Sequence, residues 1–481
     1  MNRKMVLSLT GRIILLEAAL LAVPLLISLI YGDHGTVPFL ITIAIALASG
    51  GALTLLVKPK NQTIYAKEGF LVTALAWLIL SAIGALPFVL SKEIPSYIDA
   101  FFETVSGFTT TGASILTDVE AMCHSMLFWR SFTHWMGGMG VLVLMVAIVP
   151  SLSGQTIHVL RAEMPGPTMG KLVPKLKDTA RILYLLYMAL TALEFVMLLL
   201  GGMPLFDSAI HALGTAGTGG FGIKSDSIGS YSPYLQWVIA VFMMLFGVNF
   251  NMYYLLVIRQ FKPVFKSEEF WTYVIVVVLS SAVITVNILP LYANLAEAAR
   301  HAFFQVNTIV STTGFSTADF DQWPQVSRTL LVLLMFMGGC AGSTAGGLKV
   351  SRLVLLYKTI RRELRHLLHP RSVGVVRFEG KRVDNSVLVS VSTYFALYMA
   401  LFAVFFIIVS FQPGYDFTSN FTAVASCFNN IGPGLNLVGP TQSFAGYTPL
   451  IKVFLSFAML FGRLEIYPLL ISLSPSTWLK K

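Results

Sequence analysis

Residues 101–114 read FFETVSGFTTTGAS, a stretch that begins as an apolar segment and ends in small and hydroxyl-bearing residues. The same pattern returns at SAIHALGTAGTGGF (208–221), FFQVNTIVSTTGFS (303–316) and FTAVASCFNNIGPG (421–434). Aligned on one glycine each, the four stretches share Gly112, Gly219, Gly314 and Gly432. The chain therefore contains four internal repeats, each built around a segment too short to cross a membrane.

The composition identifies the solvent around these repeats. The 481 residues are 56% hydrophobic and only 12% charged, with a mean hydropathy of +0.75. Apolar stretches of about 20 residues, the length that crosses a hydrocarbon core, recur along the chain. They predict an all-α polytopic membrane protein. The N-terminal run carries Arg12 and Glu17 and has no small-residue cleavage site, so we expect a retained first helix instead of a signal peptide.

Ten stretches are candidate spans: 8–30, 37–57, 70–90, 127–149, 180–202, 234–258, 271–292, 328–358, 388–411 and 448–472. With the four short stretches they predict two leading helices followed by four units of helix, re-entrant segment and helix. The predicted parts are the two leading helices (1–69), a first unit (70–150), a second with its preceding cytoplasmic loop (151–269), a third with a basic cytoplasmic linker (270–385) and a fourth (386–481).

Charge predicts the orientation. If the ten spans alternate, the loops 58–69, 151–180, 259–269 and 349–385 share one side. Ten Lys and Arg but only two glutamates lie between Lys349 and Arg382. The positive-inside rule then places both termini in the cytoplasm and the four short segments in the extracytoplasmic half. Topology thus explains the net charge of +10, and no nucleic-acid partner is expected. The three cysteines form no CxxC pair, so no disulfide framework or zinc site is predicted.

Re-entrant segments need a physical reason to exist. Non-helical backbone at membrane depth is tolerated only where it is buried in protein or lines a water-filled cavity. Four extended Thr- and Gly-rich segments around one axis would present rings of carbonyl oxygens, which replace the hydration shell of potassium in channels. One such stretch fits close helix packing equally well. Four in matching places favour a cation conduction path.

A further glycine-rich stretch, MGGCAGSTAGGLK (337–349), interrupts the span 328–358. A phosphate-binding loop would follow a strand and face water, and the apolar flanks argue against it. We expect a flexible intramembrane loop beneath the repeats that blocks or clears the path, with Lys349 at its cytoplasmic edge. Arg463 is expected to project into the same path; the alternative is a pairing with a carboxylate other than Glu465, which should face away.

These repeats, together with WRSFTHWMGGMG (129–140), GGCAGSTAGGLKVSRL (338–353) and FGRLEIYP (461–468), resemble the Trk/Ktr/HKT superfamily of cation transporters. With its two leading helices, the chain is most similar to TrkH, the membrane-subunit family of the bacterial Trk potassium uptake system. The resemblance covers essentially the whole chain. It implies a multi-pass protein of the bacterial cell inner membrane whose four repeats each resemble one potassium-channel subunit. It also implies a homodimer and a cytosolic, nucleotide-binding TrkA-like regulatory subunit.

The resemblance also implies roles for individual residues. It implies a potassium-binding filter of Thr110, Thr111, Gly112, Gly217, Thr218, Gly219, Thr312, Thr313, Gly314, Asn430, Ile431 and Gly432. It implies a gate of Gly338, Gly339, Gly342, Ser343, Thr344, Gly346, Gly347 and Arg463. Gly112, where sodium-preferring plant relatives have serine, favours potassium, while the fourth loop departs most from the channel pattern. Around these residues, Glu103 and His211 are expected to brace the filter, Asp207 to cap its short helix, and His134 and Cys340 to serve as packing residues.

Three classes of function make different predictions for this sequence. A channel-like potassium uptake subunit explains the four repeats of like orientation. A secondary carrier, proton- or sodium-coupled, would have broken helices and a site at the membrane midplane, and it stays as the alternative. An ATP-using pump or enzyme would need a soluble nucleotide domain of about 100–150 residues, and no loop is that long. We therefore expect no enzyme activity and no cofactor in this chain, with potassium as the transported ion. The basic loops 151–180 and 349–385 are the expected docking surfaces for the cytosolic subunit.

Overall fold

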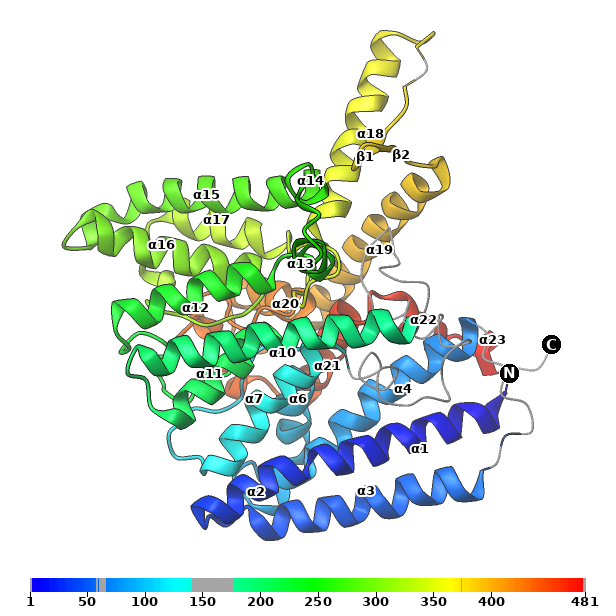
Figure 1. Ribbon diagram of the computed structural model, residues 1–481, viewed down its shortest axis with the longest axis vertical. Coiled ribbons are helices and arrows are strands. Elements are labelled where there is room, and N and C mark those ends of the chain that lie inside the picture. The colour runs from blue at the N-terminus through cyan, green and yellow to red at the C-terminus, as the bar shows by residue number, and fades with distance from the viewer. Residues whose placement is uncertain (1, 58, 60–65, 141–175, 373, 479–481) are drawn as a thin grey trace.

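The computed structural model describes residues 2–57, 59, 66–140, 176–372 and 374–478. Helices make up most of this part of the chain (Figure 1). Six of them, some built from two consecutive helices, are long and apolar enough to cross a membrane: Arg3–Tyr31, Thr36–Leu56, Lys67–Leu90, Asp178–Leu200, Glu268–Leu291 and Asn385–Val409. They match the predicted spans 8–30, 37–57, 70–90, 180–202, 271–292 and 388–411 to within a few residues, which confirms these helices.

Two leading helices precede the four units. The first is α1 (Arg3–Leu20) with its continuation α2 (Ala22–Tyr31), and the second is α3 (Thr36–Leu56). In Figure 1, α1 and α3 lie side by side along one edge of the molecule, and α1 also contacts α4 (Ala66–Gly84) of the first unit. The described chain ends meet, because the Arg3 guanidinium donates to the Trp478 carbonyl oxygen at 2.8 Å. Both ends of the described chain therefore lie on the same side of the molecule.

Each of the four units has the same order of elements. The first helices are long: α4 with the short α5 (Leu86–Leu90), α10 (Leu176–Leu200), α15 (Glu268–Ile288) with the 3-10 turn η2 (Leu289–Leu291), and α19 (Asn385–Val409). The short helices are α6 (Tyr97–Phe108), α11 (Leu205–Gly217), α16 (Leu295–Val310) and α20 (Phe417–Asn429). The second helices begin with α7 (His124–Gly138), α12 (Pro233–Phe246), α17 (Gln325–Met335) and α21 (Pro449–Arg463). Three 3-10 turns lie between the short helix and the second helix of the third and fourth units: η3 (Phe320–Gln322), η4 (Asn436–Val438) and η5 (Phe444–Gly446).

The units close into a ring. Within each unit the short helix contacts both the first and the second helix. The second helix also contacts the short helix of the next unit. These neighbouring contacts run α7 to α11, α12 to α16, α17 to α20 and finally α21 back to α6. Because the last contact returns to the first unit, the short helices and the loops that follow them surround one common axis.

Three of the second helices are interrupted, and for two of them the expectation of one continuous span was too simple. The stretch 234–258, predicted as one span, is α12 and α13 (Phe250–Val257), which bend by 93° at their junction. The stretch 448–472 is α21 and α22 (Tyr467–Leu473), separated by residues with left-handed backbone, Glu465 (φ 55) and Ile466 (φ 66). The interruption predicted within 328–358 is confirmed between α17 and α18 (Val350–Leu368). Residues 141–149 of the span 127–149 lie outside the described residues.

Breaks inside a membrane protein need partners for the backbone groups that they release. At the α12–α13 break the Gly247 carbonyl accepts the Cys340 N–H at 2.9 Å, and the Phe250 N–H donates to the Gly342 carbonyl at 3.0 Å. Cys340 and Gly342 belong to the loop that interrupts the third unit. Interruptions in two neighbouring units therefore satisfy each other, a long-range pairing that the local sequence does not reveal.

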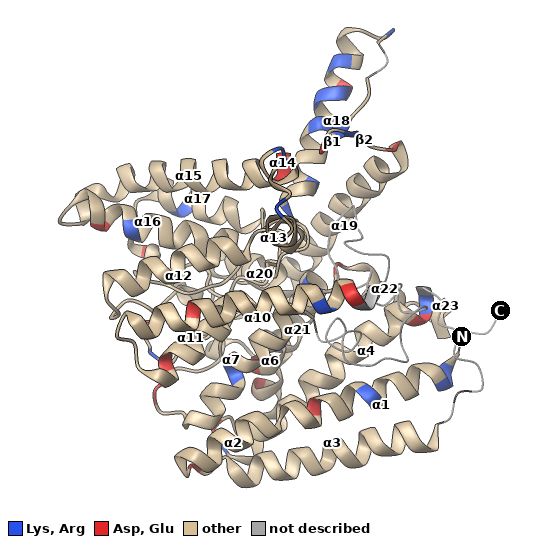
Figure 2. Ribbon diagram, viewed as in Figure 1, with Lys and Arg blue, Asp and Glu red and all other residues tan. Residues whose placement is uncertain are grey.

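One part projects from the body. The helix α18, with the hairpin β1 (Arg377–Phe378) and β2 (Lys381–Arg382), extends beyond α15 at the top of Figure 1. The blue segments of α18 in Figure 2 mark its Lys and Arg residues. Between α13 and α15 lies the short α14 (Phe261–Phe265), and α23 (Pro475–Trp478) ends the described chain. Of the predicted basic loop 151–180, residues 151–175 lie outside the described residues.

Asp33, in the loop between α2 and α3, holds the leading helices against the first unit. Its carboxylate accepts the Ser125 N–H and the Ser125 hydroxyl, both at 2.9 Å, and the Gly35 N–H at 3.0 Å. Burial raises the pKa of Asp33, but the hydrogen bonds from Ser28, Ser125 and Gly35 outweigh it, so the pKa is lowered from its ordinary value. The ionised carboxylate is thus the form that stabilises this junction.

Replacing Asp33 by Ala should lower the free energy of unfolding by about 1–3 kcal/mol, since the Ser125 donors lose their acceptor. Because the folded-state pKa is depressed, this contribution is present above the unfolded pKa of about 3.9 and is lost as the pH falls through the folded value. Thermal unfolding in detergent, at neutral and acidic pH, measures both effects. Asp384→Ala is the control, because the Asp384 side chain makes no capping hydrogen bond. Equal unfolding temperatures for the two variants at neutral pH would contradict the assignment.

Candidate functional site

Four loops with one backbone conformation follow the four short helices. In each loop a non-glycine residue takes a left-handed conformation: Thr110 (φ 56), Thr218 (φ 54), Thr312 (φ 57) and Asn430 (φ 57). Two residues further on, each loop has a glycine with positive φ: Gly112 (78), Gly220 (78), Gly314 (94) and Gly432 (106). A positive φ is uncommon for residues other than glycine. Its occurrence at one position in four loops therefore identifies these positions as structural equivalents.

The second loop is shifted by one residue from the sequence alignment. The N–H of Gly219 donates to the Gly214 carbonyl, which repeats the Thr111 to Ser106 hydrogen bond of the first loop. The equivalents of Thr110, Thr111 and Gly112 are therefore Thr218, Gly219 and Gly220, whereas Gly217 is the last residue of α11. The sequence alignment was ambiguous here because three of the five residues 217–221 are glycine. The sequence did contain a signal for the correct register. Residues 218–222 fit the pattern Thr-x-Gly-aromatic-Gly, as in the TVGYG loops of potassium channels.

The four loops meet at a ring of carbonyl oxygens. A Cβ placed on Gly112 would lie under 3.0 Å from the Gly219 carbonyl oxygen, and one on Gly220 would meet the Thr313 carbonyl oxygen equally closely. The same holds for Gly314 against the Ile431 carbonyl oxygen and for Gly432 against the Thr111 carbonyl oxygen. Each glycine thus abuts the next loop at one equivalent carbonyl, and the sequence of contacts closes on itself. The four carbonyls belong to Thr111, Gly219, Thr313 and Ile431.

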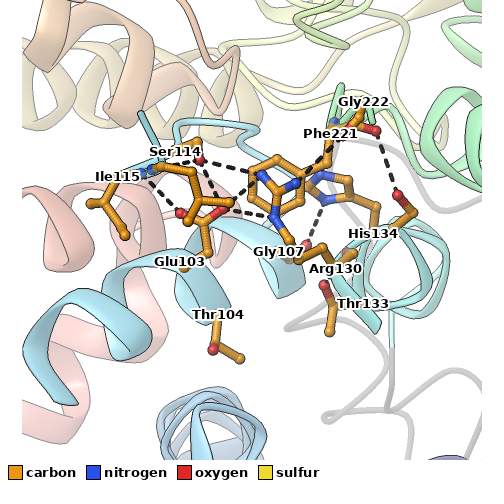
Figure 3. A network of polar contacts seen from close by, with 12 residues as sticks. Glu103, Thr104, Gly107, Ser114, Ile115, Arg130, Thr133, His134, Phe221 and Gly222 are labelled. Carbon is orange, nitrogen blue, oxygen red and sulfur yellow. Dashed lines mark hydrogen bonds and ion pairs between the residues drawn. The ribbon is translucent and has the colours of Figure 1, made fainter. Parts of the chain in front are cut away.

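An ion pair braces the outer end of the first loop (Figure 3). The Arg130 guanidinium and the Glu103 carboxylate are 2.7 Å apart, and both side chains are buried, at 3% and 0% exposure. Glu103 also accepts the Ser114 hydroxyl and the Ile115 N–H, each at 2.9 Å. The expectation that Glu103 braces the loop is confirmed, and its partner is Arg130 of α7.

The same network reaches the second loop. The Arg130 guanidinium lies 4.0 Å above the Phe221 ring. His134 Nδ1 donates to the Gly107 carbonyl at 2.8 Å, and its Nε2 accepts the Phe221 N–H at 3.3 Å. His134 was expected to be a packing residue and is instead a polar bridge between two units (Figure 3). No sequence signal identified this role, because its two partners are backbone groups.

In the second unit one expectation is confirmed and one is wrong. His211 packs its ring against Phe315, which directly follows Gly314, so it does support a loop from behind. Asp207 does not cap α11, because that helix begins at Leu205 and has Pro204 at the capping position. The Asp207 carboxylate accepts the Tyr231 hydroxyl at 2.7 Å instead.

A cavity opens on one side of the carbonyl ring. Its volume is about 260 Å³, and Gly112, Gly220, Gly314 and Gly432 all line it. Arg130 and Lys224 also reach this cavity. The four loops therefore form its floor and face a space large enough for several water molecules.

The glycine-rich loop between α17 and α18 lies on the opposite side of the ring. The Gly346 N–H donates to the Thr312 hydroxyl at 2.7 Å, and a Cβ on Gly346 would lie 2.7 Å from the Asn429 carbonyl oxygen. The Thr344 hydroxyl donates to the Phe246 carbonyl at 3.2 Å. The loop therefore contacts the third and fourth repeats and the broken helix of the second unit.

Arg463, at the end of α21, connects this loop to the ring. Its guanidinium donates to the Thr110 hydroxyl at 3.1 Å, to the Thr344 carbonyl at 2.8 Å and to the Gly138 carbonyl at 2.8 Å. It lines a cavity of about 50 Å³ together with residues of the glycine-rich loop. Neither sequence alternative described this arrangement in full, since the guanidinium is directed at backbone carbonyls.

Two further charged residues lie near Arg463, and Glu465, as expected, is not its partner. Glu465 pairs with Arg352 of α18 at 2.6 Å, which is possible because α21 ends at Arg463 and the chain turns. Lys349 is 2% exposed and donates its ammonium to the Ala345 carbonyl. Lys349, expected at the cytoplasmic edge of the loop, directly precedes α18, and its side chain is buried against the loop.

The glycine-rich loop is also connected to the projecting hairpin. Glu269, at the start of α15, accepts the Ala341 N–H at 2.7 Å and the Ser351 N–H at 3.1 Å, so it holds both ends of the loop. The Glu379 carboxylate, in the turn of the hairpin, accepts the Ser267 hydroxyl at 2.9 Å and the Glu269 N–H at 3.2 Å. One continuous set of hydrogen bonds thus leads from the hairpin to the loop beneath the ring.

Comparison with known proteins places this arrangement among cation transporters. The family model described as "TrkH: Cation transport protein" matches residues 36–480. The Trk system potassium uptake protein TrkH of Salmonella typhimurium is 37% identical, over 99% of this chain and 100% of that protein. The corresponding protein of Escherichia coli K12 is 36% identical over the same shares. The crystal structure of the potassium transporter TrkH from Vibrio parahaemolyticus covers 100% of both chains with a TM-score of 0.90 and 33% identity.

Glu103→Gln and Arg130→Met should each lower the free energy of unfolding by about 3–5 kcal/mol, because each leaves a buried charge without its partner. The double variant Glu103→Gln/Arg130→Met should be clearly less destabilised than the sum of the two. A double-mutant cycle from denaturant unfolding in detergent measures the coupling. Additive effects of the two substitutions would show that the pair does not act as a unit.

Proposed function

Because this chain belongs to the TrkH family of cation transport proteins, whose members are transporters and not enzymes, we propose that it takes up potassium across the bacterial inner membrane. The route is a channel-like pore along the axis of the four units, with the four loops as a selectivity filter. The main support is the closed ring formed by the Thr111, Gly219, Thr313 and Ile431 carbonyls. Carbonyl oxygens in such a ring replace the water that potassium loses on entry.

The filter of this proposal follows the structural register. It consists of Thr110, Thr111, Gly112, Thr218, Gly219, Gly220, Thr312, Thr313, Gly314, Asn430, Ile431 and Gly432. The four short helices end at these loops, so their negative C-terminal dipoles point toward the path and favour a cation there. The Asn430 amide donates to the Thr111 hydroxyl at 3.0 Å, so the fourth loop makes a cross-link that its threonine-bearing counterparts would not.

The pore spans the membrane by ten segments in this proposal. Six are the continuous spans, and four are the second helices, which begin with α7, α12, α17 and α21. Both termini are cytoplasmic in this proposal, because the basic loops mark the cytoplasmic side. The 260 Å³ cavity is then the outer entrance, and the glycine-rich loop lies on the cytoplasmic side of the filter.

The glycine-rich loop and Arg463 form the gate. The guanidinium sits directly beneath Thr110, where its charge repels a cation that leaves the filter. The loop can change its path without repacking large residues, because most of its residues have a small side chain or none. The gate residues of the loop are Gly338, Gly339, Gly342, Ser343, Thr344, Gly346 and Gly347. Opening requires the hydrogen bonds of Arg463 to Thr344 and Gly138 to break.

Control by a cytosolic TrkA-like subunit fits the projecting part of the chain. α18 carries an exposed apolar row at spacings of three and four, namely Tyr357, Ile360, Leu364 and Leu367, beside its basic residues. In this proposal the apolar row packs against a second copy in a homodimer, and the basic surface receives the cytosolic subunit. A movement of the hairpin would reach the gate through Glu379 and Glu269, the two carboxylates that connect them.

The alternative is a secondary carrier, proton- or sodium-coupled, because the interrupted helices α12–α13 and α21–α22 are a feature that carriers also have. Recording in a planar bilayer separates the two. Unitary currents support the channel, whereas saturating uptake without unitary currents supports the carrier. The function itself is tested by radioactive rubidium uptake into proteoliposomes, with and without the cytosolic subunit; no uptake in either condition would refute it.

Gly112→Ser should reduce selectivity for potassium over sodium, because a Cβ at this position with φ 78 must displace the Gly219 carbonyl from the ring. The measurement is the reversal potential under mixed potassium and sodium conditions. Gly51→Ser is the matched control, since nothing lies within 4 Å of a Cβ at Gly51. An unchanged reversal potential in Gly112→Ser would remove this glycine from the filter.

Arg463→Gln should raise rubidium uptake in the absence of the cytosolic subunit severalfold, because the charge that repels cations is lost. Arg361→Gln, a change of the same kind at an exposed position of α18, should leave basal uptake unaltered. Uptake by Arg463→Gln that still depends on the subunit as strongly as in the unaltered protein would argue against this gate.

A further inference from the structure

Three side chains with metal-binding chemistry meet where the leading helices join the first unit. His34 comes from the loop between α2 and α3, Glu93 follows α5, and Cys123 directly precedes α7. One ligand atom from each, an imidazole nitrogen, a carboxylate oxygen and the thiol sulfur, lies within 4.8 Å of the other two. None of these residues lines the cavities on either side of the carbonyl ring, and none has a part in the proposed transport path.

Hydrogen bonds already orient the three groups. His34 Nε2 lies 2.9 Å from Glu93 Oε1, and the Cys123 N–H donates to the same oxygen at 3.1 Å. The Cys123 sulfur lies 3.4 Å from the Ser125 hydroxyl, whose residue is itself held by Asp33. Glu93 follows Lys92, which has a left-handed backbone with φ 65, so the turn that presents this carboxylate is a constrained one.

An ordinary surface ion pair does not explain the whole group. A His–Glu contact would use one carboxylate oxygen, and an exposed pair of this kind contributes only about 0–1 kcal/mol. The second oxygen, Glu93 Oε2, is buried and has no hydrogen-bond partner among the described residues. Buried carboxylate oxygens normally have a partner, so this atom indicates a ligand.

We propose that His34, Glu93 and Cys123 bind one zinc-like divalent transition-metal cation. Nitrogen, oxygen and thiolate sulfur are the donors that such cations take, at about 2.0–2.3 Å, whereas magnesium and calcium prefer oxygen donors alone. Three protein ligands leave the fourth tetrahedral position to water. The thiol proton is released to solvent on binding, since the thiolate is the ligand.

Modest side-chain movement brings the ligands to bonding distance. Ligands at such bond lengths in a tetrahedron are about 3.3–3.8 Å apart, so the two nearest atoms separate slightly and the farther ones approach. The His34 side chain is 60% exposed and free to turn, while Glu93, at 11%, is held in place. The bound cation would clamp the leading helices to the helix that carries Arg130 and His134.

The first test is calorimetric titration of Zn²⁺ into the full-length protein, purified without a histidine tag. We expect one site per chain, with affinity lowered at least about tenfold in Cys123→Ser and in His34→Ala. His366→Ala/His369→Ala is the control, because it removes an exposed histidine pair on the end of α18 and should leave the affinity unchanged. Loss of binding in this control, or full affinity in Cys123→Ser, would overturn the proposal.

The second test needs no substitution and so does not depend on a variant that folds. Cys123 is partly exposed, whereas Cys340 and Cys427 are 0% exposed, so a thiol-alkylating reagent should react first at Cys123. Zn²⁺ should slow that alkylation at least about tenfold, and Mg²⁺ at the same concentration should not. An alkylation rate at Cys123 that Zn²⁺ leaves unchanged would refute the site. Neither test involves transport, so their outcome is independent of the proposed function.

Discussion

Four loops can meet on one axis only because each has, at the same position, a residue without a Cβ. Gly112, Gly220, Gly314 and Gly432 lie so close to a carbonyl of the next loop that any side chain would have to displace backbone. This steric limit decides the spacing of the short helices that lead into the loops. Those helices in turn decide where the long helices pack. The carbonyl ring is thus the constraint on which the arrangement of the four units depends.

The second constraint is the need to satisfy polar groups away from water. The break after α12 exposes the Gly247 carbonyl, and the break after α17 frees the Cys340 N–H; these two groups bond to each other. Arg463 is held by carbonyls from α7 and from the glycine-rich loop. Because the interruptions after α12 and α17 satisfy each other, a movement at one of them must affect the other. This interdependence is the physical basis of the proposal that the hairpin controls the gate.

Several elements could be predicted because their cause is local. An apolar run of about 20 residues forms a helix wherever it lies in the chain, and the six continuous spans were found to within a few residues. The break at 337–349 was predictable because its glycines disfavour helix and its flanks do not. The break at Gly247–Asn249 was missed because it contains a single glycine, and its cause is a loop from the third unit.

By itself, the sequence determined the number of units, their order and the places where small residues must lie, since repetition and periodicity are properties of the chain alone. The tertiary structure decided which residue of the second loop joins the ring, that His134 bridges two units, and that Glu465 pairs with Arg352. It also brought His34, Glu93 and Cys123 together. These outcomes depend on groups far apart in the chain, often backbone carbonyls that every residue has, so no residue pattern could identify them before the helices were packed.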